Sequence, residues 1–162
     1  MDYHPVVQKI RSLLDSNGIV YKFFEHEAVR TSEEAHRLRP GYEMSQGAKA
    51  LIVKIKKADG TREFIQCVIS ADLRLDGNKL KAFLGAKSIS FATAEESNEI
   101  TDGIEFGGIP PFGNLFGLTV YLDPAIKKHQ EILFNCGDRR ATIAMQLSDY
   151  LRIVKPIEIE IT

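Results

Sequence analysis

The sequence predicts an α+β fold, with a mixed, mostly antiparallel central sheet flanked by helices. Apolar residues recur at helical spacing near both ends of the chain, and short runs of β-branched and aromatic residues lie between them. Two of these runs are joined by an Asp-Gly turn, which is a strong signal for an antiparallel hairpin. Because the 162 residues contain no internal repeat and no linker-like tract, we expect one domain spanning residues 1–162.

The N-terminal forty residues predict two helices separated by a strand. The first helix should end at Gly18 and is expected from apolar residues at helical spacing, namely Val6, Val7, Ile10, Leu13 and Leu14. A run of β-branched and aromatic residues then predicts a strand over 19–24. Thr31 with Glu34 three residues later is a capping-box pattern, so we expect a helix that ends near Leu38. The segment Arg39-Pro40-Gly41 breaks this helix.

The middle of the chain predicts a hairpin followed by a helix. Strands are expected at about 48–55 and 63–70, joined by Ala58-Asp59-Gly60, because Asp-Gly tolerates a positive φ. Asp76 can cap a short helix, which should end at Gly85.

The remaining predicted elements are shorter. They are a strand over 87–91, one or two helical turns over 94–98, strands over 118–122, 132–136 and 142–145, and a helix over 148–154. Pro156 ends this helix. After it, Ile157, Ile159 and Ile161 alternate with acidic residues and predict a final edge strand.

Composition excludes several classes of protein. The 21 Lys and Arg residues are balanced by 22 Asp and Glu residues, so a general basic coat for nucleic acid is excluded, although a local patch is not. The apolar runs are too short to span a bilayer and the N-terminus lacks a signal-peptide pattern, so we expect a cytoplasmic protein without a membrane partner. Cys67 and Cys136 are expected as buried free thiols in a reducing compartment.

The standard catalytic motifs are absent from the sequence. It contains no nucleophile elbow, no phosphate-binding P-loop, no dinucleotide-binding glycine motif and no metalloprotease motif. The four histidines and two cysteines show no metal-ligand spacing, so we expect no metal site.

One lysine breaks the pattern of its predicted strand. Because side chains alternate between the two faces of a strand, Lys49 shares a face with the apolar Leu51 and Val53. Lys54, by the same count, points the other way. Since an unpaired buried ammonium is costly, two interpretations stay open. Either Lys49 extends to solvent from the end of the strand, or it is held there to meet an anion.

A second unusual segment covers residues 107–117, Gly-Gly-Ile-Pro-Pro-Phe-Gly-Asn-Leu-Phe-Gly. It holds four glycines, two prolines and no charged residue. Glycines let a ligand approach the backbone closely and prolines stiffen the chain, so the N–H groups of this loop can act as fixed donors to a carbonyl or an oxyanion. The alternative is a loop that simply packs into the core, and the pattern does not separate the two.

Six motifs, in their order along the chain, resemble the YbaK/prolyl-tRNA synthetase-associated (INS-like) domain family of single-domain aminoacyl-tRNA deacylases. They are Glu25-His26-x-Ala28-Val29-x-Thr31, Gly47-Ala48-Lys49-Ala50-Leu51, Ala71-Asp72-x-Arg74-Leu75-Asp76 with Lys79-Leu80, Leu84-Gly85-Ala86-Lys87, the run from Gly107 to Gly113, and Phe134-Asn135-Cys136-Gly137. The resemblance extends from about Gly18 to Pro156. Each motif alone is short, and their shared order makes the resemblance specific.

The resemblance implies an enzyme that hydrolyses the ester of a mischarged tRNA at its 3′-terminal adenosine, without a metal or cofactor. It implies a catalytic set made of Lys49, Gly107, Gly108, Pro111 and Gly113. It also implies a substrate-binding set made of His26, Thr31, Ile109, Pro110, Asn135 and Cys136. For His26 a structural role near the pocket entrance is an equal alternative. Cys136 is not expected to act as a nucleophile, because no histidine is evidently placed to activate it.

The implied mechanism uses Lys49 to hold a phosphate or another electron-rich group of the tRNA 3′ end. The loop backbone would fix the aminoacyl carbonyl, and water would attack with help from a ribose hydroxyl of the substrate. The implied substrates carry a small amino acid such as Ala, Ser, Thr or Cys. The implied partner is the 3′ end of aminoacylated tRNA, with an aminoacyl-tRNA synthetase as a second candidate. The alternative function is a non-catalytic module that binds tRNA or a synthetase.

Overall fold

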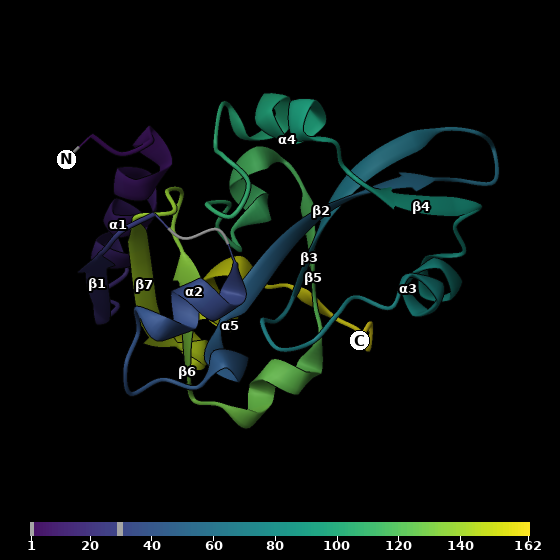
Figure 1. The fold of residues 1–162 in the computed structure, drawn as a ribbon. Helices are drawn as coiled ribbons and strands as arrows, with labels where there is room; N and C mark the ends of the chain where they lie inside the picture. Colours follow the sequence, from purple (N-terminus) through teal and green to yellow (C-terminus); the bar gives the residue numbers. More distant parts are fainter. Residues whose placement is uncertain (1, 29–30) are drawn as a thin grey trace.

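The computed structural model describes residues 2–28 and 31–162, and their strands form two sheets (Figure 1). The first sheet is antiparallel and has the order β1 (Tyr21–Glu25), β7 (Ala141–Gln146) and β6 (Glu131–Asn135). The second has the order β4 (Ser88–Phe91), β2 (Ala48–Lys56), β3 (Arg62–Ser70), β5 (Thr119–Leu122) and β8 (Ile157–Glu158). Strand β5 runs parallel to β3 and to β8, and the other strand pairs of the described residues are antiparallel. The predicted α+β class with mostly antiparallel pairing is therefore confirmed, although the strands divide between two sheets instead of one.

Five helices accompany the sheets in the described part of the chain. They are α1 (Pro5–Ser16), α2 (Ser32–Arg37), α3 (Gly77–Leu84), α4 (Ala94–Thr101) and α5 (Leu147–Val154), with short 3-10 helices η1 (Met44–Gln46), η2 (Gly113–Phe116) and η3 (Pro124–Lys128). Two caps form as the sequence predicts, because Thr31 accepts from the Glu34 amide at 3.1 Å and Asp76 caps α3. Gly85 ends α3 in the left-handed region, with a φ of 62°. None of the helices in the described residues has the length and apolar character that crossing a membrane requires.

The hairpin of β2 and β3 is buried on both faces and separates two hydrophobic cores. Lys49 pairs with Ile69 in the register, and Val53 pairs with Ile65, so odd-numbered residues of both strands share one face. That face packs on α3 and the C-terminal residues through Leu80, Ile159 and Ile161. The other face joins the larger core, which α1, α5 and the three-stranded sheet complete. The alternation that singles out Lys49 is thus confirmed.

Three elements differ from the sequence-based expectations by two residues or more at one end. Helix α4 continues to Thr101, three residues beyond 94–98. Strand β1 begins at Tyr21 instead of Ile19. Strand β8 holds only two residues, because its partner β5 ends at Leu122 and the next residue, Asp123, takes over the hydrogen bonding with its side chain.

The Asp123 carboxylate anchors the C-terminal residues. Its Oδ2 accepts from the amides of Ile161 at 2.8 Å and Thr162 at 3.0 Å. The alternation at Ile159 and Ile161 therefore reflects burial, at 5% and 0% exposure, without a continued strand ladder.

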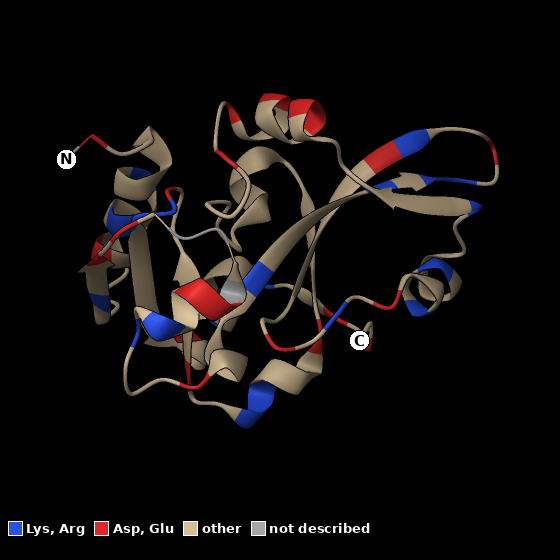
Figure 2. Cartoon of the chain, viewed as in Figure 1, with Lys and Arg blue, Asp and Glu red and all other residues tan. Residues whose placement is uncertain are grey.

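Charge is distributed in separate patches (Figure 2). Acidic residues gather on α4, which carries Glu95, Glu96 and Glu99, whereas α3 carries Lys79 and Lys81. This pattern agrees with the near-zero net charge and leaves only local basic surfaces available for a phosphate backbone.

Candidate functional site

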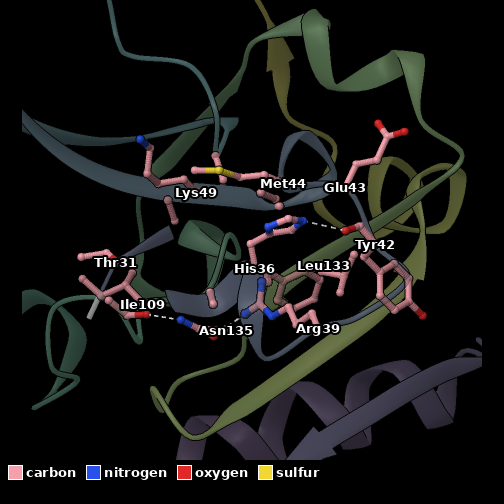
Figure 3. Close-up of a pocket in the computed structure, with 17 residues that line it drawn as sticks. Thr31, His36, Arg39, Tyr42, Glu43, Met44, Lys49, Ile109, Leu133 and Asn135 are labelled. Atoms are coloured by element: carbon pink, nitrogen blue, oxygen red, sulfur yellow. Dashed lines mark hydrogen bonds between the residues drawn. The ribbon is translucent and has the colours of Figure 1, made fainter. Parts of the chain in front are cut away.

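A cavity opens where the two sheets meet, and Figure 3 shows the side chains around it. Its lining residues are Thr31, Ala35, His36, Arg39, Tyr42, Glu43, Met44, Gly47, Ala48, Lys49, Ala50, Ala71, Gly107, Ile109, Leu133, Phe134 and Asn135. They come from α2 and the segment that follows it, from η1, from the start of β2, from β6 and from the glycine-rich loop. Segments far apart in the sequence therefore share one site.

Gly47 makes this junction possible. It forms an isolated parallel bridge with Leu133, and this bridge links the start of β2 to β6 of the other sheet. A Cβ atom at position 47 would lie 2.9 Å from the Cβ of Ala71 and 3.2 Å from the carbonyl oxygen of Met44. Because real side chains do not approach so closely, only glycine fits without a shift of the backbone. The strand that begins here brings Lys49 to the cavity.

Lys49 lies half-buried at the rim of the cavity. Its Nζ donates a hydrogen bond of 3.1 Å to the carbonyl oxygen of Leu73, and no carboxylate among the described residues lies within ion-pair distance. Burial lowers the pKa of this amine, and the nearby Arg74 lowers it further, while Glu33 and Asp72 oppose the shift. In Figure 3 the amine points away from Arg39 and Asn135. Two of its three N–H bonds remain available for a ligand.

Arg39 is a second cation in the cavity, and sequence reasoning did not select it. It follows α2, and its Nη2 donates bonds of 2.8 Å to both the Asn135 Oδ1 and the Thr142 Oγ1 atoms. Its Nε is inaccessible to solvent and has no hydrogen-bond partner in the described chain. Burial lowers the pKa of Arg39 to about 10, so the guanidinium stays charged at neutral pH. The sequence pattern indicated only that the segment Arg39-Pro40-Gly41 breaks the preceding helix.

The two acceptors of Arg39 are themselves held in place. Asn135 donates through Nδ2 to the carbonyl oxygen of Gly107. Thr142 contacts the Nε2 of His26 at 2.7 Å, and the Nδ1 of His26 contacts the Glu27 carbonyl oxygen at 2.7 Å. A carbonyl can only accept, so Nδ1 carries the proton, and in the neutral ring Nε2 accepts from the Thr142 hydroxyl. His26 thus supports the cavity from outside and does not line it.

The glycine-proline loop packs into the core and reaches the cavity only at its first residues. The Gln66 side chain donates to the Pro110 carbonyl oxygen at 3.0 Å and accepts from the Gly113 amide at 2.8 Å. Tyr150 donates to the Pro111 carbonyl oxygen at 2.6 Å. These bonds use polar groups that would otherwise be buried and unsatisfied. They also hold the preceding Ile109 at the cavity wall.

Two glycines of the loop meet the same structural demand. A Cβ at Gly113 would lie 3.0 Å from the Gln66 side chain, and one at Gly108 would lie 3.3 Å from the backbone of Asp138 and Arg139. Both positions therefore require close packing of the backbone. Gly107, in contrast, lines the cavity with a φ of 87°, which side chains rarely adopt.

Among the described residues, those around the cavity form no arrangement typical of a protein nucleophile. Cys136 is fully buried, its Sγ lies 3.6 Å from the Ala141 carbonyl oxygen, and burial raises its pKa to about 12. Ser45 contacts the Nε2 of His129 at 2.7 Å, but neither residue lines the cavity. Within residues 2–28 and 31–162, no group of three or more His, Cys, Asp or Glu side chains could hold a metal ion.

The structure brings together part of the set implied by the sequence. Lys49, Gly107, Thr31, Ile109 and Asn135 line one cavity. Gly108, Pro110, Pro111, Gly113, His26 and Cys136 lie behind it or beside it. Val29, which belongs to one of the motifs, lies outside the described residues. Arg39 and His36 line the cavity although no motif indicated them.

A family model described as the aminoacyl-tRNA editing domain matches residues 26–153 of the chain. The multifunctional Ser/Thr-tRNA deacylase ProXp-y of Escherichia coli (strain K12) is 34% identical over 150 residues, which cover 92% of this chain and 88% of that protein. An uncharacterized protein of Bacillus subtilis (strain 168), YwhH, is 29% identical over 132 residues and covers 78% of each chain.

Solved structures share the fold over nearly the whole chain. A crystal structure described as a candidate trans-editing enzyme for prolyl tRNA synthetase has a TM-score of 0.82 and 26% identity, and covers 99% of both chains. The structure of the hypothetical protein APE2540 has a TM-score of 0.81 at 22% identity, with coverage of 94% of this chain and 98% of that one, and supports the fold alone.

Proposed function

The chain belongs to the aminoacyl-tRNA editing domain family, and on this premise we propose that it deacylates tRNA mischarged with serine or threonine, acting in trans. The predicted family and the predicted enzyme class, an aminoacyl-tRNA deacylase, are confirmed. The choice of serine and threonine is supported by the relative that is 34% identical and named for these substrates. The observation that carries the proposal is one cavity shared by Lys49, Gly107, Ile109 and Asn135.

Lys49 is proposed to bind a phosphate or another electron-rich group at the 3′ end of the tRNA. Its amine donates one hydrogen bond to the backbone, which leaves two N–H bonds of the ammonium form free, and it has no carboxylate partner among the described residues. A compact ammonium of this kind suits the oxygen atoms of a phosphate group. Binding there would replace water around a cation that burial has already partly desolvated.

The segment Gly107–Ile109 is proposed to hold the aminoacyl carbonyl group. The Ile109 amide makes no hydrogen bond with a described residue, although the side chain is 8% exposed and lines the cavity. An N–H group fixed in this way can stabilise the negative charge that develops on the ester oxygen during attack. The core-facing bonds of Pro110, Pro111 and Gly113 are proposed to fix the loop, so that their contribution is positional.

The proposed step is hydrolysis of the ester bond between the amino acid and the terminal ribose. Water adds to the carbonyl carbon, the carbon–oxygen bond to the ribose breaks, and the ribose oxygen takes up a proton. The products are a free amino acid and an uncharged tRNA. A ribose hydroxyl of the substrate is proposed to assist the attacking water, since His36, which lines the cavity, contacts a backbone carbonyl oxygen and no carboxylate of a described residue. We place this reaction in the cytoplasm, where translation uses charged tRNA.

A deacylation panel tests the proposal. One tRNA charged in turn with Ser, Thr, Ala, Cys and Pro is incubated with the protein, with and without an added aminoacyl-tRNA synthetase. Hydrolysis of the Ser and Thr esters by the protein alone is the expected result. If tRNA binds but every ester survives in both conditions, the chain is a binding module. If hydrolysis appears only with the synthetase, action by the protein alone is refuted and the synthetase becomes a required partner.

A further inference from the structure

Arg39 differs from the arginines that form ion pairs in the described part of the chain. Arg139, Arg140 and Arg152 each pair with a carboxylate, at distances of 2.6, 2.8 and 3.0 Å. Burial lowers the pKa of Arg39, yet the structure records no carboxylate of a described residue within 4 Å of its guanidinium. Its two partners are the neutral oxygen atoms of Asn135 and Thr142. The charge of this guanidinium is therefore held in position without being neutralised.

The guanidinium also has unused hydrogen-bond donors. It carries five N–H bonds, and the two that are used both come from Nη2. The Nε–H is buried without a partner, and Nη1 makes no hydrogen bond with any described residue. An unsatisfied buried donor destabilises the fold, and more so when it is charged. Because Arg39 lines the cavity, a ligand oxygen atom that approaches the guanidinium from there would give one of its other unused donors a partner.

Residues of two strands of the three-stranded sheet fix the position of the Arg39 guanidinium. Asn135 ends β6 and is held by the Gly107 carbonyl oxygen, while Thr142 lies in β7 and is held by His26. Figure 3 shows Arg39 beside Asn135, away from the amine of Lys49. The guanidinium of Arg39 is therefore held in one conformation before a ligand binds, so it can bind an oxygen atom at a defined position without a further loss of side-chain entropy.

The chemistry of an aminoacyl ester limits which oxygen this can be. Its α-ammonium group is positive and would be repelled by Arg39. The phosphates belong to the nucleotide part and are matched by Lys49 at the rim. The wall around Arg39 includes the buried apolar side chains of Ala35, Leu133 and Phe134, which suit a small, neutral group. The side-chain hydroxyl of serine or threonine has this size and supplies an acceptor oxygen.

We propose that Arg39 is a specificity-determining residue that binds the side-chain hydroxyl of the aminoacyl group and thereby selects serine and threonine over alanine. The inference rests on the proposed deacylase function. A site that expects a hydroxyl disfavours a substrate without one, because its buried donors then stay unpaired. The other outcome, in which Arg39 binds a phosphate, would affect every charged tRNA equally.

The experiment compares Arg39→Gln with Arg37→Gln, which replaces an exposed arginine at the end of α2 that does not line the cavity. One tRNA is charged with Ser, Thr or Ala, and kcat/KM is measured for each ester. For Arg39→Gln we expect a loss of about 100-fold on Ser and Thr and a change below threefold on Ala. Arg37→Gln should leave the ratio of Ser to Ala hydrolysis unchanged. An equal loss on all three esters overturns the proposal.

The wild-type protein keeps the proposal falsifiable if Arg39→Gln fails to fold. It should hydrolyse the Ser ester at least tenfold faster than the Ala ester, and equal rates refute hydroxyl selection by Arg39. If the wild type hydrolyses no ester at all, the proposed function and this inference both fall. If it hydrolyses the Ser ester but the ratio is insensitive to Arg39, only the inference falls.

Discussion

The cavity contains two cations that the fold holds in opposite ways. Lys49 lies at the rim on a flexible stem, and its amine has one hydrogen bond, to the backbone of Leu73. Arg39 is held by two side chains from different strands and has an Nε that solvent does not reach. This difference favours two separate binding roles for the two residues. A mobile point charge suits a phosphate group that can approach in several orientations, whereas a fixed fork suits one oxygen atom in one position.

The largest effect is expected from removing the cation at the rim. Lys49→Ala should lower kcat/KM about 1,000-fold, and by the same factor for every ester, because the group it binds belongs to the tRNA and not to the amino acid. Single-turnover deacylation of Ser- and Ala-tRNA measures this. Lys54→Ala is the matched control, since Lys54 lies in the same strand on the other face, where it pairs with Glu96 at 2.5 Å. If the Lys49→Ala variant keeps wild-type activity, Lys49 has no role in binding or hydrolysing the substrate.

The two cations also differ in what the sequence could indicate. Lys49 stands in a regular strand, where alternation over a few residues reveals a charge on an apolar face. Arg39 follows a six-residue helix and precedes Pro40, a context that is typical of a solvated helix end. Its environment comes from Asn135 and Thr142, which are 96 and 103 residues away in the chain. No local pattern contains that information.

The same distinction explains the rest of the fold. Helix caps and the Asp59-Gly60 turn were predictable, because their hydrogen bonds lie within a few residues. The junction between the two sheets includes the long-range bridge between Gly47 and Leu133, which no local pattern indicates. The inward packing of the glycine-proline loop depends on Gln66, a buried side chain 44 residues away from the Pro110 carbonyl group. Composition showed that the loop was unusual but left both of its interpretations open.

A second substitution removes a difference between Arg39 and the ion-paired arginines, because it gives Arg39 a carboxylate partner. Asn135→Asp places a carboxylate against the guanidinium, and the resulting ion pair should compete with the substrate hydroxyl. We expect kcat/KM to fall about 30-fold on Ser-tRNA and only a few-fold on Ala-tRNA, since the contact to Gly107 is also weakened. The ratio of the two rates is therefore the relevant quantity. If the ratio of Ser-tRNA to Ala-tRNA hydrolysis equals that of the wild type, the net charge at the contact between Arg39 and residue 135 does not affect the choice of amino acid.

The pH dependence of enzymatic activity tests the role of Lys49 separately from that of Arg39. Burial and Arg74 lower the pKa of its amine, while Glu33 and Asp72 act in the opposite direction. Because the protonated amine is the form that binds an anion, enzymatic activity should decline as pH rises through this lowered pKa, below the ordinary value of 10.5. Initial rates are measured after subtraction of the uncatalysed hydrolysis at each pH. In Lys49→Arg the decline should move to higher pH, and an unchanged profile would assign it to another group.

The smallest effect is expected at His36, which lines the same cavity as both cations and is assigned to neither subsite. Its Nε2 contacts the Tyr42 carbonyl oxygen at 3.0 Å, so the proton lies on Nε2 and the neutral ring presents Nδ1 as an acceptor. If a ribose hydroxyl assists the water, this acceptor is not needed, and His36→Gln should change kcat less than threefold across pH 5–8. The measurement is decisive because a loss above 100-fold, together with a vanished acidic limb of the profile, would identify His36 as the general base. Substrate-assisted attack would then be refuted, while the separate roles of Lys49 and Arg39 in binding would stand.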